Sequence, residues 1–317
     1  MASNQETGVE HATTTGITTA SHPFCDPKCD FVLQTGDNVL FHVHKVILSL
    51  VSPVFEGMFS ISPMDAQEMH NGRPSIHVSE DSTSLRDFLI WCDPRSTELS
   101  KTLESLKNAL EVADKYSCDS VIKRIESFMY SNPHMWQHAP LVAYSLSIRF
   151  RFDSLAPIAA RMCFKIPMSQ WPSNPDMGHI SGLAMHNLMD YHYKAGAAAA
   201  SAATDFSWIP RTVGCPSSYF TMPCGSEKDC KTVGAGSNRW LAWFVDYMKA
   251  VAERVQLTPV CEMSQDLNLL TSIHSKISTS KCPNCHVHAH TRLTQFSEIL
   301  GVEINRRIAE VPFTIKY

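Results

Sequence analysis

Two short apolar runs, residues 31–33 and 39–43, lie close together in the first part of the chain. The sequence Thr-Gly-Asp-Asn stands between them, and Gly, Asp and Asn tolerate the positive φ angles of tight turns. Short apolar runs on either side of such a turn are typical of paired strands. The pattern therefore predicts a β-hairpin.

A helical spacing of apolar residues begins after Lys45 and is interrupted at Ser52-Pro53. Proline lacks an amide hydrogen and disrupts a helix interior, so we expect a helix, a break and a second short helical segment. The apolar positions are Val46, Ile47, Leu50, Val51 and Val54, followed by Phe55, Met58 and Phe59.

The next segments alternate between polar and periodic sequence. Residues 60–74 are polar and are expected to form a loop, whereas residues 75–78 alternate like a single strand. A helix is expected from Ser84, and Asp93-Pro94 ends it. Two amphipathic helices around residues 103–113 and 119–129 follow with a short link, which predicts an antiparallel pair.

Residues 135–165 keep a helical pattern, and the Pro- and Gly-containing stretch 167–178 indicates a linker. Beyond it, helical patterns cover residues 180–200, 240–255, 266–277 and 288–308, with an irregular stretch at 205–238. We therefore divide the chain into a disordered tail (1–25), a first domain (26–130), its helical extension (131–166), the linker (167–178) and a mostly helical region (179–317).

Composition narrows the classes of function. The 317 residues carry 27 Lys and Arg against 31 Asp and Glu, a formal net charge of -4, and only 18% are charged. A mildly acidic chain without a concentrated basic face is not expected to bind nucleic acid electrostatically. No apolar run reaches the roughly 20 residues that span a bilayer, so no membrane partner is expected. The first 22 residues lack Lys, Arg and a continuous apolar stretch, unlike a secretory signal. We expect a cytoplasmic or nuclear protein.

The order of these elements and the amino-acid sequence of their motifs resemble those of the BTB/POZ domain. The resemblance rests on Cys29-Asp30-Phe31-Val32-Leu33, on Phe41-His42-Val43-His44-Lys45-Val46-Ile47-Leu48, and on Ser52-Pro53-Val54-Phe55 with Met58-Phe59. The corresponding motif residues are Asp30, Phe41, His44, Lys45, Leu48, Ser52, Pro53, Phe55, Met58 and Phe59. The amino-acid sequence of later segments, such as Cys92-Asp93-Pro94, is most similar to that of the expanded fungal group of BTB proteins.

The resemblance implies an α+β domain in which a short hairpin and a lone strand are capped by helices, followed here by the mostly helical region. It also implies a protein-protein interaction module without catalytic activity, commonly a homodimer that serves as a scaffold for a further partner. The motif residues are a proline turn and apolar anchors, which are residue types suited to packing rather than to proton transfer.

Some relatives recruit a cullin-type ubiquitin ligase scaffold as substrate adaptors. They use a large apolar residue, any residue and then Glu in the loop before the lone strand, where this chain has Ala66-Gln67-Glu68. Alanine buries far less area than a large anchor, so Ala66 is a poor substitute and the adaptor role is the less favoured alternative.

A metal site is a further hypothesis. Cys282 and Cys285 have the two-residue spacing at which two thiolates face one Zn²⁺, and Cys224 with Cys230, or Cys215, could complete the four ligands of a structural zinc in a nuclear regulator. The alternative is that all 11 cysteines of this chain without an export signal are thiols in a reducing compartment. His286, His288 and His290 are expected to spread around the start of a helix.

Signatures of an enzyme are missing from the sequence. It contains no G-x-S-x-G, H-E-x-x-H or P-loop pattern, and Gly234-Ala235-Gly236 lacks the third glycine of a dinucleotide-binding turn. The prediction is a non-catalytic interaction protein.

Overall fold

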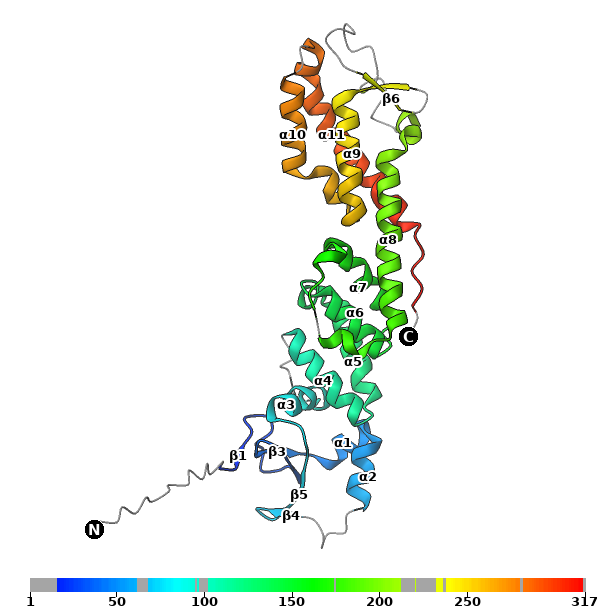
Figure 1. Cartoon of the computed structure of the whole chain (residues 1–317). Helices are drawn as coiled ribbons and strands as arrows, with labels where there is room; N and C mark the ends of the chain where they lie inside the picture. The colour runs from blue at the N-terminus through cyan, green and yellow to red at the C-terminus, as the bar shows by residue number, and fades with distance from the viewer. Residues whose placement is uncertain are drawn as a thin grey trace, which may run out of the picture. The chain divides into compact units, whose positions relative to one another are not determined.

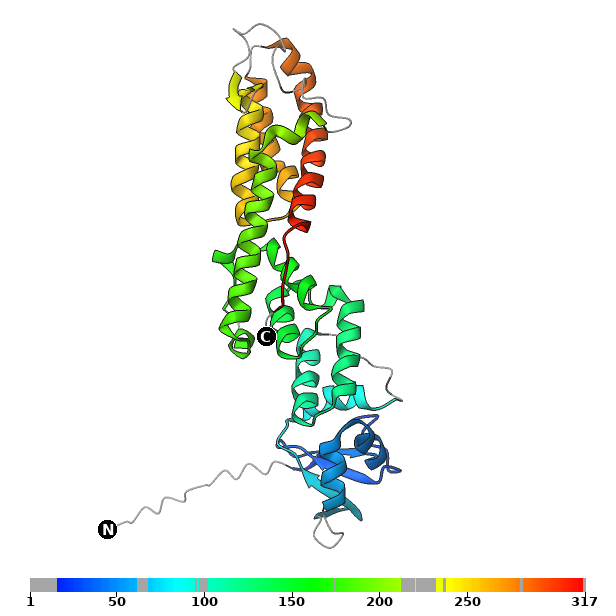
Figure 2. The same cartoon turned by 90° about the vertical axis from the view of Figure 1, so that its right-hand side faces the viewer.

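The computed structural model describes residues 16–61, 68–94, 96, 102–173, 175–211, 220, 232–235, 238–279 and 282–315 (Figures 1 and 2). The chain divides into two compact units, Met1–Trp136 and Gln137–Tyr317. No helix among the described residues is long and apolar enough to cross a membrane.

The first unit contains a five-stranded sheet in the order β1-β3-β2-β5-β4. The predicted hairpin is confirmed, because β2 and β3 are antiparallel with Phe31 opposite Val43. Asn38 has a φ of 64°, the left-handed residue that closes such a turn. All four residues of β2 are buried, as expected for a central strand. The strands are β1 (Thr18–Thr19), β2 (Phe31–Gln34), β3 (Val39–Val43), β4 (Glu68–His70) and β5 (Arg73–His77).

Helices complete the first unit, and the break at Ser52-Pro53 separates the first two of them as predicted. The antiparallel pair expected near residues 103–129 is present as two packed helices. The helices are α1 (Lys45–Val51), α2 (Pro53–Ile61), α3 (Ser82–Cys92), α4 (Leu103–Lys115), α5 (Asp119–Ser131) and the short 3-10 helix η2 (Pro133–Met135).

Two strands of this sheet were not expected. The loop prediction for residues 60–74 is wrong in its last part, where β4 pairs with β5 through Asn71 and Gly72, which have φ angles of 50° and 77°. Asn71-Gly72 is a strong signal for a two-residue hairpin turn, because both residues tolerate the positive φ angles that such a turn requires. At the other edge, β1 pairs in parallel with β3, and Phe24 is buried. Ordered structure therefore begins before residue 26, within the segment expected to be a disordered tail.

The second unit is mostly helical. Helices are confirmed at all four positions that the sequence predicts beyond residue 179. Its main helices are α6 (Pro140–Arg149), α7 (Ala156–Met162), α8 (Gly182–Thr204), α9 (Ala242–Leu257), α10 (Leu267–Ser278) and α11 (Pro283–Ala309). The 3-10 helices are η3 (Cys163–Lys165), η4 (Met168–Gln170), η5 (Pro175–His179), η6 (Phe206–Arg211) and η8 (Cys261–Gln265). Strands β6 (Thr232–Ala235) and β7 (Asn238–Leu241) pair antiparallel. β6 lies in the stretch expected to be irregular, whereas β7 ends inside the segment expected to be helical, so the helix α9 begins at Ala242 rather than at residue 240.

The boundary between the units differs from the sequence division. It falls after Trp136, so most of the expected helical extension (131–166) and the expected linker (167–178) lie in the second unit. Residues in the linker are packed: Trp171 donates its indole hydrogen to the Ile166 carbonyl at 3.1 Å, and Asp176 is buried. The prolines there mark turns between short helices rather than an extended connection.

Candidate functional site

The start of α1 is held by the side chain of Asp30. One of its oxygens accepts a hydrogen bond from the Lys45 amide at 3.0 Å, and the same oxygen lies 3.8 Å from Nδ1 of His44. Because the first amides of a helix lack partners within the helix, this carboxylate stabilises α1 from the neighbouring strand. On its other side, Nε2 of His44 lies 3.6 Å from the Cys29 thiol. The Asp and His of the motif are therefore positioning residues at the junction between hairpin and helix.

The start of α2 depends on Ser52. Its hydroxyl accepts a hydrogen bond from the Phe55 amide at 3.1 Å and donates one to the Tyr116 carbonyl at 2.6 Å. Pro53 occupies the first position of the helix, where a missing amide hydrogen does no harm. The Ser-Pro pair thus ends one helix, begins the next and ties both to the end of α4.

Aromatic rings connect these helices to the sheet. Phe55 is fully buried and stacks on Tyr116 with ring centroids 4.3 Å apart. Phe59 meets Phe31 edge to face at 4.8 Å. The Lys45 ammonium lies 4.8 Å from the centroid of the Phe31 ring, within the range of a cation-π contact. Phe41 and Leu48 are almost fully buried, and Met58 is half-buried, so most apolar residues of the motif belong to the core.

Glu80 lies at the edge of this core and contacts the last residue of α4 and the residue that follows it. It forms an ion pair with Lys115 and accepts a hydrogen bond from the Tyr116 hydroxyl at 2.9 Å. Burial, together with this hydrogen bond, raises the pKa of Tyr116 well above its usual value. Tyr116 therefore stays protonated and acts as a structural donor, which is a role that sequence spacing alone does not reveal.

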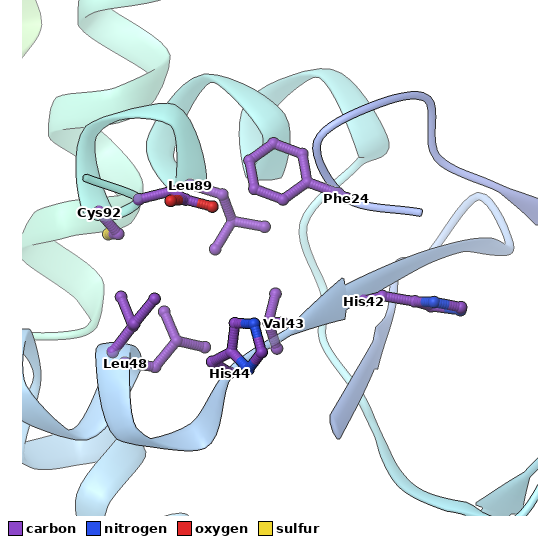
Figure 3. A pocket seen from close by; sticks show the side chains of 9 residues that line it. Phe24, His42, Val43, His44, Leu48, Leu89 and Cys92 are labelled. Atoms are coloured by element: carbon purple, nitrogen blue, oxygen red, sulfur yellow. The ribbon is translucent and has the colours of Figure 1, made fainter. Parts of the chain in front are cut away.

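A pocket opens beside the motif, between the end of β3, α1 and the end of α3 (Figure 3). Leu89 and Cys92 of α3 face Leu48 of α1 across it, while His42 points away. Burial raises the pKa of the Cys92 thiol well above its usual value, so this thiol is not an activated nucleophile. The lining is suited to packing rather than to catalysis and consists of Phe24, His42, Val43, His44, Ile47, Leu48, Leu89, Cys92 and Asp93.

The outer face of the first two helices exposes apolar side chains. Val46 and Leu50, one helical turn apart on α1, are 63% and 80% exposed, and Val54 at the start of α2 is 36% exposed. We call these three residues the α1 face. Neighbouring exposed apolar side chains are more informative than single ones, because they mark surfaces that partners cover.

The structure leaves the other candidate residues untested. Ala66 lies outside the described residues, and Glu68 is the first residue of β4. Cys215, Cys224 and Cys230 also lie outside them, whereas Cys282 is buried at the start of α11 and Cys285 falls in the first turn of that helix. Among described residues, no three His, Cys, Asp or Glu side chains are grouped closely enough to hold a metal ion. The cullin contact and the cysteine zinc site stay predictions.

Comparison with known proteins decides the nature of the first unit. The sequence model of the BTB/POZ domain matches residues 24–133. These residues form a BTB/POZ domain. Its matched range begins at the buried Phe24 and ends just before the boundary between the two units. The BTB/POZ domain is a protein-protein interaction module.

Among solved structures, the BTB domain of zebrafish PATZ1 is similar to this one. It is 21% identical, and the match covers 32% of this chain and 76% of that chain with a TM-score of 0.25. No curated protein matches the chain. The second unit begins at Gln137, beyond the residues that the BTB/POZ model matches.

Proposed function

We propose that the BTB/POZ domain self-associates through the α1 face and that the resulting homodimer recruits a further protein partner. The observation that carries the proposal is the exposure of Val46 and Leu50 one turn apart on a helix whose other side builds the core. In a two-fold symmetric contact both protomers contribute the same surface, so the three residues of the α1 face bury six side chains in the dimer. Burying a Val or Leu contributes about 1.5–3 kcal/mol each, before the cost of association.

Leu50→Glu tests this proposal directly. The side chain is 80% exposed, so a carboxylate there should leave folding intact while placing like charges opposite each other in the symmetric contact. We expect at least a tenfold weaker self-association by sedimentation velocity, with an unchanged circular dichroism spectrum. Tyr130→Glu, at a 55% exposed apolar position on α5, is the matched control and should associate like the wild type. Equal association of both variants and the wild type would exclude the α1 face as the interface.

Recruitment of a partner is tested separately from self-association. The wild-type chain and Leu50→Glu are each used to capture proteins from a lysate. We expect Leu50→Glu to lose the partners that need the dimer and to retain the partners that bind the second unit. Capture of a cullin by the wild type, abolished by Glu68→Ala, would instead support the substrate-adaptor alternative. Zinc at one ion per purified chain, lost on replacing Cys282 and Cys285 by Ser, would support the zinc-stabilised regulator.

A further inference from the structure

Two histidines from neighbouring helices of the second unit lie in contact. His274 is on α10 and His290 on α11, and their ring centroids are 4.5 Å apart with an interplanar angle of 61°. The two helices are consecutive and pack against each other (Figure 1). The pair therefore bridges the α10–α11 hairpin from two separate elements.

The hydrogen bonding of this pair is incomplete. Nε2 of His274 is buried and has no hydrogen-bond partner among the described residues. A buried polar nitrogen without a partner is unfavourable, and in native proteins it calls for a specific explanation such as a bound ion.

We propose that His274 and His290 together bind one divalent transition-metal ion between α10 and α11. Neutral imidazole suits Zn²⁺, Ni²⁺ and Cu²⁺, and bonds of about 2.0–2.1 Å to one ion would hold two ring centroids about 4.5–5 Å apart. The observed separation of 4.5 Å lies in this range. Among the described residues, no third ligating side chain is grouped with the pair.

This site differs from the predicted cysteine site in ligands and in consequence. A site made of imidazoles binds Ni²⁺ and Cu²⁺ well, whereas a site rich in thiolates selects Zn²⁺. An ion held by one residue from each helix resists separation of the hairpin, so binding is coupled to folding. The site is independent of the proposed self-association, which involves the other unit.

Metal-dependent melting of the full chain tests the proposal. The chain is treated with a chelator, dialysed, and melted with and without excess Ni²⁺ under reducing conditions. We expect saturating Ni²⁺ to raise the Tm of the wild type by about 5 °C or more. His274→Gln and His290→Gln should each reduce the shift to below about 1 °C, because one imidazole alone binds weakly.

Controls separate this site from others on the chain. His288→Gln changes an exposed histidine on the same helix and should keep the full shift. Cys282→Ser should keep it as well. Metal-free melting curves and circular dichroism establish that each Gln variant folds, and titration calorimetry should show one Ni²⁺ per chain lost in both. An unchanged shift in the Gln variants, or its loss in Cys282→Ser, would overturn the proposal.

Discussion

Ser52 connects α1, α2 and the end of α4 through one hydroxyl group. It is buried, and it both caps α2 and donates to the Tyr116 carbonyl. Ser52→Ala should lower the free energy of unfolding by about 1–3 kcal/mol, because a cap is lost and the buried Tyr116 carbonyl keeps only the weak donor of the Cys118 thiol at 3.5 Å. Urea denaturation measures this difference.

The control for Ser52→Ala is Ser60→Ala on the same helix. The Ser60 hydroxyl is exposed and donates to the Glu56 carbonyl one turn earlier, so its removal should change stability by less than about 0.5 kcal/mol. Equal effects of the two substitutions would show that the buried network of Ser52 contributes nothing beyond helix propensity.

Phe55 fills the centre of the aromatic core. It is fully buried and contacts the rings of Tyr116 and Phe59. Phe55→Ala should destabilise the BTB/POZ domain by about 3–5 kcal/mol, since both transfer free energy and packing are lost. Thermal melting with circular dichroism measures the effect, and an undiminished Tm would refute this role.

His192 makes the stability of the second unit depend on pH. Its ring is fully buried between Phe164 and Trp171, and burial lowers its pKa. In the unfolded chain His192 binds a proton near its ordinary pKa of about 6.5, whereas in the folded unit it binds a proton only at lower pH. Stability should be complete above that pH and fall as the pH drops below it.

Unfolding free energies of the wild type and His192→Gln between pH 7.5 and 5.5 test this coupling. We expect the wild type to lose more stability than the variant across this window, because glutamine does not titrate. Carboxylates with lowered pKa, such as Asp205 and Glu303, respond only at more acidic pH. Parallel pH profiles would contradict the assignment.

At the scale of elements, α8 and α9 pack at a distance that only a glycine permits. A Cβ at Gly196 would lie 2.4 Å from the Gln256 carbonyl oxygen, and buried alanines line the same part of α8. Gly196→Ala should therefore lower the Tm by several degrees as the helices are pushed apart.

Gly57→Ala in α2 is the matched control, because a Cβ there meets nothing within 4 Å. Alanine reduces the entropy of the unfolded chain and favours helix, so this variant should gain about 0.4–1 kcal/mol. A Gly196→Ala protein as stable as the wild type would show that the two helices separate freely.

Elements with strong local signals could be predicted from the sequence. The hairpin of β2 and β3 follows from its turn residues, and the break between α1 and α2 follows from Pro53, so the elements that position the motif residues could be predicted. β1 could not be found, because Thr18 and Thr19 are exposed and gain their structure only by pairing with β3. The roles of Cys29 and Glu80 likewise depend on contacts across 15 and 35 residues, which periodicity does not report.

At the scale of the whole molecule, we propose that the BTB/POZ domain presents the α1 face to a second copy of the chain, while the helical second unit binds other partners. The boundary at Trp136 was missed because helical periodicity continues across it, and periodicity does not say which helices share a core. The proline-rich segment resembled a linker by composition, yet its residues are packed.

Multi-angle light scattering on the full chain over a hundredfold concentration range tests this claim most directly. The mass of one chain is 35.4 kDa. We expect a species of twice that mass that dissociates on dilution and is shifted to monomer by Leu50→Glu. A monomer at every concentration would contradict it.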